Sequence, residues 1–327
     1  MKVLSLSKNY IKPNRLNAKT SFGSRIIPEP LTNRSKNLDY KFFNKDFSVV
    51  SLPFGLKIID DKFVLRKKTP TIAIIDTFKN PGNIQIADGV KVSHGQLVSK
   101  YATSNLENEY GILAFNIVPS SITNPHKALK EALEELVEMQ RKFKNVQTLN
   151  LSVGEFLDFT FLSKKSGLNL TSQNAYEKRN EILEFIKNSK EERFKFIFSQ
   201  IQAINNLVDE GVEVYLASGN IGDKGLNLLS LSKAQHIVCA DDYSDATRFF
   251  STESANAFHT FQKKYDENGI LVKIFDDRIA FTPQELDLKL KKKSIFSRIK
   301  KEYFYTIYGT SYSSPSKMND DLINKKK

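Results

Sequence analysis

Short apolar runs alternate with segments of helical periodicity from about Thr71 onward, and this alternation constrains the fold more than any other feature of the sequence. Thr71–Ile75 is a continuous apolar run that ends at Asp76, which is typical of a parallel strand covered on both faces. Strands that alternate with helices indicate a parallel sheet with right-handed crossovers. The sequence therefore predicts an α/β fold, with a mainly parallel sheet and helices on both faces.

The same periodicity places the remaining elements. Leu271–Phe281 predicts an antiparallel hairpin that turns at Asp276-Asp277, and Ile58–Leu65 suggests another hairpin at an Asp-Asp turn. Glu155–Thr171 has no regular pattern and is expected to be irregular. Further strands are predicted at Gly111–Val118, Val146–Val153, Val212–Ala217 and His236–Ala240, and helices at Gln96–Thr103, Pro125–Phe143, Asn174–Asn188 and Glu191–Glu210.

Composition divides the chain into three parts. Residues 1–69 are rich in Asn, Lys, Ser and Pro, and they are expected to form an N-terminal extension, partly disordered before Lys36. Residues 70–318 are expected to form one domain, and residues 319–327 a basic tail. The 327 residues are enough for one large domain or two modest ones.

The net charge of +12 is concentrated in the N-terminal arm, in Lys289–Lys301 and in Lys325–Lys327. Such runs are more often solvated surface than a nucleic-acid site, so no specific nucleic-acid partner is expected. The Lys289–Lys301 run also contains Ile295, Phe296 and Ile299. A basic amphipathic helix that touches an anionic surface therefore stays open as an alternative.

Cysteine, histidine and targeting signals narrow the function classes further. The single cysteine, Cys239, excludes an internal disulfide framework and lies in an apolar strand, where a small core residue is expected. His126, His236 and His259 have no partner pattern and are interpreted as structural or exposed. No signal-peptide core or bilayer-spanning run is visible, so a cytoplasmic location is expected, with export by another route left open.

Side chains suited to acyl transfer follow the carboxyl ends of the predicted strands, where the binding sites of parallel sheets usually lie. Acyl transfer needs a nucleophile, a base, a carboxylate that holds the imidazole and donors for the oxyanion. The order Asp, His, Ser is one of those known to build this geometry on an α/β sheet. The candidates in chain order are Asp76, His94, Ser152, Gly154, Asn220 and Ser311.

The stretch Tyr308–Pro315 is the expected place of the nucleophile. Gly309 permits backbone angles that other residues resist, and Pro315 has no N–H donor, which suits the first turns of a helix. The interpretation is a sharp turn that opens a helix, with the Ser311 hydroxyl exposed and free backbone N–H groups facing a developing oxyanion. Gly-Thr-Ser turns are also common in structural loops.

Six segments of the chain, each on a predicted strand, helix or turn, follow one another in the same order as the motifs of a known protein family. They are Ile72–Thr77, Ser93–Val98, Asn150–Gly154, Ala217–Asn220, His236–Ser251 and Gly309–Pro315. Together they resemble the subtilisin-like serine proteases, the subtilases, over roughly Thr71 to Pro315 with insertions. The resemblance implies a serine endopeptidase.

The resemblance also implies roles for individual residues. Ser311 would attack the scissile carbonyl, and His94 would accept its proton and pass it to the leaving amine. Asp76 would hold the imidazole, while Asn220 and the Ser311 N–H would bind the oxyanion. The backbone of Leu151, Ser152, Val153 and Gly154 would pair with an extended polypeptide substrate.

The resemblance implies no cofactor. Bound calcium is common among relatives, but the sequence offers no ligand cluster to assign, so no metal site is predicted.

Departures from the family pattern support an alternative. Phe78 stands where the family usually has glycine, and Gln96 replaces the expected threonine. The regions 155–199 and 256–308 are expanded. Ser316–Lys327 is polar where the family buries an apolar helix, so a short and loosely held helix is expected. The alternative is a catalytically weak or inactive subtilase-like peptide-binding protein, and a basic nucleic-acid or membrane-surface binder ranks last.

Overall fold

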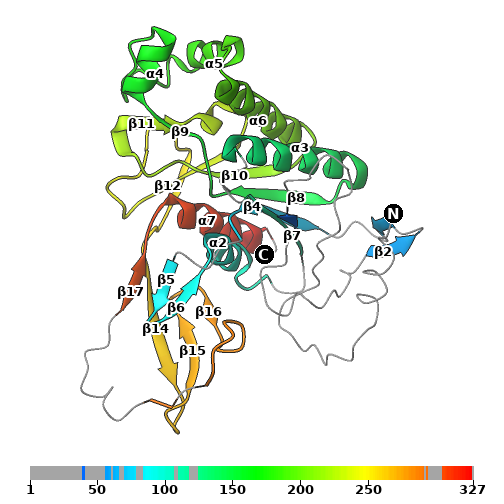
Figure 1. Cartoon of the computed structure of the whole chain (residues 1–327), viewed down its shortest axis with the longest axis vertical. Helices are drawn as coiled ribbons and strands as arrows, with labels where there is room; N and C mark the ends of the chain where they lie inside the picture. The colour runs from blue at the N-terminus through cyan, green and yellow to red at the C-terminus, as the bar shows by residue number, and fades with distance from the viewer. Residues whose placement is uncertain are drawn as a thin grey trace.

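A computed structural model of the chain has a central β-sheet between two layers of helices, with a smaller sheet to one side (Figure 1). Among the residues that it describes, no helix combines the length and the apolar character needed to cross a membrane. The described residues are 39–40, 56–59, 62–65, 70–78, 84–106, 110–117, 124–290, 292–293 and 304–325.

The central sheet has seven strands in the order β1-β7-β4-β8-β10-β12-β13. Every neighbouring pair is parallel except β1 and β7, so the predicted α/β fold with a mainly parallel sheet is confirmed. The strands are β1 (Asp39–Tyr40), β4 (Thr71–Asp76), β7 (Gly111–Asn116), β8 (Val146–Leu151), β10 (Glu213–Ala217), β12 (His236–Ala240) and β13 (Glu253–Ala255).

Helices cover both faces of this sheet, as the apolar run of β4 predicts. Successive side chains of a strand point to opposite faces. Ala73 and Ile75 accordingly pack in the core of α3 (Pro125–Phe143) and α6 (Glu192–Asp209). Ile72 and Ile74 pack in a separate core with α2 (His94–Thr103) and α7 (Thr310–Asn324) on the other face (Figure 1).

A second sheet, in the order β16-β15-β14-β17, lies beside α2 and the start of α7. Its core includes Phe261 and Ile274 from the sheet, Tyr101 from α2 and Tyr312 from α7. The predicted hairpin turning at Asp276-Asp277 is confirmed by the antiparallel pair β15 and β16. The elements are β14 (His259–Tyr265), β15 (Leu271–Phe275), β16 (Ala280–Phe281), β17 (Tyr305–Ile307) and the adjoining hairpin β5 (Ile84–Ala87) and β6 (Val90–Val92).

The predicted irregular region after β8 is instead ordered. It contains β9 (Phe156–Asp158), which pairs with β11 (Gly225–Asn227), and α4 (Phe159–Ser166). The Asp158 side chain caps α4 by accepting a bond from the Phe161 N–H at 2.7 Å, a local signal that periodicity did not reveal. The expectation of irregular structure there was wrong. Next along the chain comes α5 (Arg179–Asn188), with short 3₁₀ turns at Gly222–Lys224 and Leu228–Leu231.

The structure bears on only some of the predicted divisions of the chain. The hairpin in the N-terminal extension is confirmed as β2 (Leu56–Ile59) and β3 (Lys62–Leu65). The predicted start of the tail at residue 319 falls inside α7, which continues to Asn324. Lys289–Lys301 and the residues before Lys36 lie mostly or wholly outside the described residues.

Candidate active site

Asp76 and His94 are joined by a short hydrogen bond. Asp76 is the last residue of β4 and is fully buried, and its Oδ1 lies 2.7 Å from Nδ1 of His94, the first residue of α2. Oδ1 also accepts a bond from the Thr77 N–H at 2.6 Å. The carboxylate is thus fixed by the backbone, and it holds one ring nitrogen while the other is left for a further partner.

The start of α2 explains one departure from the family pattern. Ser93 caps the helix by accepting a bond from the Gln96 N–H at 3.1 Å, and the Gln96 side chain accepts one from the Ser93 N–H at 2.7 Å. This reciprocal arrangement is a capping box, which satisfies two amide donors that a helix start leaves free. Gln96 therefore fixes the entry to the helix that carries His94.

Phe78, the second departure, lies against Gly95. A Cβ atom at Gly95 would be 2.7 Å from Cδ1 of the Phe78 ring, which is closer than real Cβ contacts allow. The Gly95 N–H donates to the Thr77 carbonyl at 3.0 Å, so the two segments approach along their backbones. The bulky ring at position 78 is accommodated because position 95 is glycine.

The pKa of His94 is raised above its ordinary value of 6.5. Burial lowers the pKa of the ring, but the negative charge of Asp76 and the hydrogen bond to it outweigh that effect. A quarter of the His94 side chain remains exposed, so the ring can exchange protons with a substrate or solvent. These properties suit a general base that operates near neutral pH.

Ser311 lies in the first turn of α7, next to Asn220. Gly309 precedes the helix at φ +135°, a conformation that favours glycine. The Asn220 Oδ1 accepts a bond from the Thr310 N–H at 2.9 Å, and a Cβ at Gly309 would lie 3.0 Å from Asn220 Nδ2 and 3.5 Å from Ser311 Oγ. The amide donor and the hydroxyl therefore lie on the same side of Gly309.

Pro315 frees a carbonyl at the start of this helix. It cannot donate to the residue four positions earlier, which is Ser311. The Ser152 hydroxyl donates to the Ser311 carbonyl instead, at 2.7 Å. Ser152 in turn accepts from Asn150 Nδ2 at 2.9 Å, and Asn150 Oδ1 accepts from the Ser314 hydroxyl at 2.9 Å. A buried polar network thus fixes the start of α7 to the end of β8.

The expectation that this helix is short and loosely held is wrong. α7 has 15 residues, and among its polar side chains Ser313, Ser314 and Asn319 are buried and hydrogen-bonded. Asn319 donates to the carbonyls of Ala102 and Ser104 at the end of α2, at 3.3 and 2.7 Å. Met318 and Leu322 are buried in the core that faces β4. Hydrogen bonds to buried polar side chains therefore hold α7 in place where a longer apolar stripe was expected.

The histidine and serine segments meet through Tyr312. Its ring centroid lies 5.4 Å from that of His94, and burial together with the Asp76 charge raises the pKa of the tyrosine. Within the described residues, no hydrogen bond joins the Ser311 hydroxyl to the His94 ring. Catalytic hydrogen bonds are often long or poorly aligned before substrate binds.

The predicted substrate-binding residues divide into two groups. Leu151 is buried and pairs on both sides, with Ile75 of β4 and Leu216 of β10, so its backbone edges are occupied. Ser152 is also buried and supports α7. Val153 and Gly154 are half-buried and lie beyond the end of β8.

Two residues near this edge were missed at the sequence level. Asn227 packs its side chain against Gly154, where a Cβ would lie 2.4 Å from Asn227 Nδ2, and its Oδ1 accepts from the Glu155 N–H at 3.1 Å. Phe156 is exposed, and its ring lies against Gly219, next to Asn220. Neither residue belongs to a motif, so only the folded chain brings them to the site.

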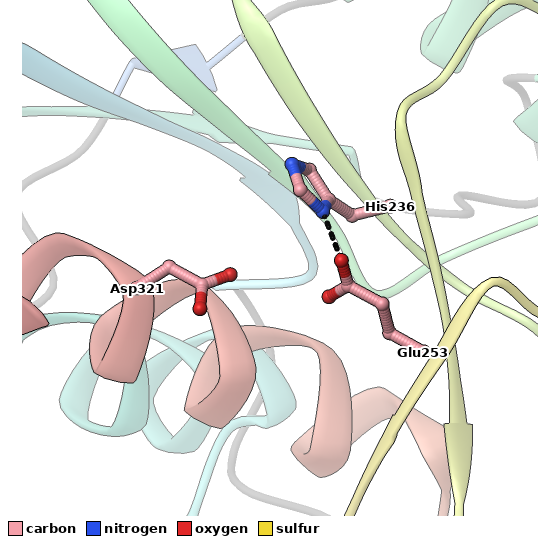
Figure 2. Close-up of side chains that lie close together, drawn as sticks. All are labelled: His236, Glu253 and Asp321. Carbon is pink, nitrogen blue, oxygen red and sulfur yellow. Dashed lines mark hydrogen bonds and ion pairs between the residues drawn. The ribbon is translucent and has the colours of Figure 1, made fainter.

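The other histidines all face carboxylates. His126 lies 2.7 Å from Glu155, which supports its interpretation as structural. Figure 2 shows His236 bonded to Glu253 at 2.7 Å, with Asp321 of α7 close by. His259 is buried beside Asp276 and Asp277. The fold therefore assembles two groups of possible metal ligands that the sequence did not reveal. Cys239 is buried, as predicted for a core residue.

Comparison with known proteins gives only distant structural likeness. No family model matches the chain, and no curated protein matches it. Solved structures that resemble it include the prenylagaramide maturation protease PagA (TM-score 0.39, 13% identity, 80% of this chain and 78% of that one). The epidermin leader peptide processing serine protease EpiP from Staphylococcus aureus matches with TM-score 0.41 and 12% identity over 78% and 64%. The patellamide maturation protease PatA matches with TM-score 0.39 and 12% identity over 79% and 81%.

Proposed function

We propose that this chain is a subtilisin-like serine endopeptidase. The observation that carries the proposal is the 2.7 Å bond between His94 and a buried carboxylate, on the face of the sheet from which α7 presents Ser311. A buried carboxylate, an imidazole of raised pKa and a serine at a helix start are the groups that acyl transfer requires.

In the proposed mechanism, His94 carries a proton from the Ser311 hydroxyl to the leaving amine, and an acyl-enzyme forms. His94 Nε2 takes the proton of the Ser311 hydroxyl as Oγ attacks the substrate carbonyl. Asp76 stabilises the imidazolium that forms and keeps Nδ1 protonated. His94 then gives the proton to the leaving amine, and the C–N bond breaks to leave an acyl-enzyme, which water cleaves by the same steps.

Two donors are proposed for the oxyanion. The amide oxygen of Asn220 is occupied by the Thr310 N–H, which turns Nδ2 toward the side of Gly309 where the Ser311 hydroxyl lies. The Ser311 N–H belongs to the first turn of α7, where amides have no acceptor within the helix. Donors fixed in this way need no reorganisation as charge develops on the substrate oxygen.

The proposed substrate is an extended polypeptide. Backbone groups of Val153 and Gly154 beyond the end of β8 are the accessible part of the predicted binding segment, and a strand-like peptide can pair with them. Phe156 and Gly219 would then border the site on the Asn220 side.

The test is hydrolysis of an unfolded protein, followed by mass spectrometry of the fragments. Ser311→Ala should abolish cleavage. Ser316→Ala is the matched control, because this serine lies in the same helix and is buried, and its hydroxyl has no hydrogen-bond partner in the described structure. Cleavage that persists in Ser311→Ala would exclude the proposed nucleophile. Peptide binding without cleavage by the folded wild type would favour the inactive peptide-binding alternative.

A further inference from the structure

The turn after β15 places two carboxylates beside a buried histidine. His259 is the first residue of β14, and Asp276 and Asp277 follow β15 directly. One ligand atom from each of these residues lies within 4.8 Å of the others. The group is separate from the Asp76–His94 pair and has no part in the proposed acyl transfer.

The spacing in this group differs from ordinary histidine–carboxylate bonds in the same chain. His94, His126 and His236 each have a ring nitrogen 2.7 Å from a carboxylate oxygen. Nδ1 of His259 instead lies 3.5 Å from Asp276 Oδ2 and 3.4 Å from Asp277 Oδ1. Ligands held about 2.0–2.1 Å from a tetrahedral metal ion are about 3.3–3.4 Å apart, so these spacings match two edges of such a site.

The imidazole of His259 is poorly satisfied by the protein alone. The residue is buried, its Nε2 has no hydrogen-bond partner in the described structure, and Nδ1 has only the long contacts to Asp276 and Asp277. A buried polar group without a good partner costs free energy. A metal ion bound to Nδ1 would replace the long contacts of that atom with ligand bonds, while Nε2 would stay without a partner.

The His259 group differs in its nearby charges from the group of His236, Glu253 and Asp321 in Figure 2. There, the Lys317 ammonium lies 2.5 Å from Asp321 and 3.1 Å from Glu253, so a cation already stands between the carboxylates. In the described part of the chain, no lysine or arginine forms an ion pair with Asp276 or Asp277. The two negative charges around His259 therefore lack a counterion that the other group has.

The surroundings of Asp276 are those of a supported metal ligand. Its Oδ1 accepts bonds from the N–H groups of Arg278 and Ile279, at 2.9 and 2.7 Å, and the Tyr101 hydroxyl donates to Oδ2. Hydrogen bonds of this kind orient ligating carboxylates. Burial and the Asp276 charge raise the pKa of Tyr101, so its hydroxyl stays protonated as a donor.

A surface depression reaches the two aspartates of the group, but His259 does not line it. The depression has a volume of about 340 Å³ and is lined by both aspartates together with Phe258, Thr260, Gln262 and Phe275. The Asp277 side chain is 71% exposed, so it can turn toward an ion that enters from this side.

We propose that His259, Asp276 and Asp277 bind a divalent transition-metal ion, with Zn²⁺ the best fit. One nitrogen and two oxygen ligands suit tetrahedral Zn²⁺ with water as the fourth ligand, whereas Ca²⁺ requires six to eight oxygens. Two aspartates and a neutral histidine also balance the ion's double charge. The bound ion would fix the second sheet to α2, because Tyr101 of α2 bonds the same carboxylate.

The test is calorimetric titration of the chelator-treated full chain with ZnCl₂, together with thermal unfolding in ZnCl₂ and in CaCl₂. Asp277→Asn is the test variant, since an exposed, nearly isosteric change should leave the fold intact. Glu253→Gln, at the group that Lys317 neutralises, is the matched control. We expect Asp277→Asn to weaken Zn²⁺ binding at least about tenfold, because even outer-shell changes have effects of this size.

Thermal unfolding provides a second readout. Zn²⁺ should raise the Tm of the wild type and of Glu253→Gln, but have a much smaller effect on Asp277→Asn. No Zn²⁺ binding by the wild type, or equal binding by Asp277→Asn and the wild type, would overturn the proposal. Stabilisation by Ca²⁺ but not by Zn²⁺ would overturn the assignment of the ion. None of these outcomes depends on peptidase activity.

Discussion

Ser152→Ala tests whether the polar network at the end of β8 supports α7, the helix that carries Ser311. The Ser152 hydroxyl donates to the Ser311 carbonyl, which Pro315 leaves without a helical donor, and it accepts from Asn150. The substitution therefore leaves two polar groups unpaired, the buried Asn150 amide and the part-buried Ser311 carbonyl.

Each unpaired buried group costs about 1–3 kcal/mol. Since the two groups belong to one network, their costs do not simply add, and we expect a loss of about 2–4 kcal/mol in the free energy of unfolding. Urea titration of the purified protein measures this loss. If the protein is a peptidase, kcat should also fall about 10–100-fold, because small displacements of a reacting group are costly.

Ser199→Ala is the control for this measurement. Its hydroxyl donates to the Lys195 carbonyl on the solvent side of α6, so its removal should change stability by no more than about 0.5 kcal/mol. If Ser152→Ala is no more destabilising than Ser199→Ala, the Ser311 carbonyl does not depend on Ser152 and this reasoning fails.

Three further predictions concern the proposed site. Asn220→Ala should lower kcat about 10²–10³-fold with little change in KM, measured by steady-state peptide hydrolysis, whereas a change mainly in KM would contradict an oxyanion role. The pH profile of kcat/KM should rise through an inflection above pH 6.5. Asp76→Asn should move this inflection to lower pH, because burial then lowers the pKa of His94 without the opposing charge of Asp76. An inflection that does not move would contradict the coupling of Asp76 to His94. Gly95→Ala should lower the free energy of unfolding by about 1–3 kcal/mol in urea titration, because the added methyl group meets the Phe78 ring. Phe78→Ala in the same chain should recover most of that loss, and no recovery would contradict the clash.

The sequence predicted the elements that carry a strong apolar period. The strand at β4 and the helix α3 appear where the periodicity placed them, since both bury an apolar face that is visible in sequence. The Asp276-Asp277 turn was found for a similar local reason. Short α4 was missed, because its start depends on an Asp158 cap rather than on a long apolar stripe.

The length of α7 could not be predicted, because its partners are distant in sequence. Ser314 bonds Asn150, and Asn319 bonds the end of α2, so polar residues that look solvent-exposed in sequence are buried in the structure. The His259 group escaped notice for the same reason. Its three candidate ligands come from the start of β14 and from the turn after β15, and they meet only when the second sheet forms.

The central claim is that Asp76, His94 and Ser311 act as one catalytic unit. The most direct measurement is the rate of covalent labelling by a fluorophosphonate as a function of pH, since it requires no knowledge of the cleavage site. We predict one adduct per chain on Ser311, a rate that rises through the pKa of His94 above 6.5, and loss of labelling in His94→Ala. No adduct on the well-folded wild type, or the same rate in His94→Ala, would contradict the account.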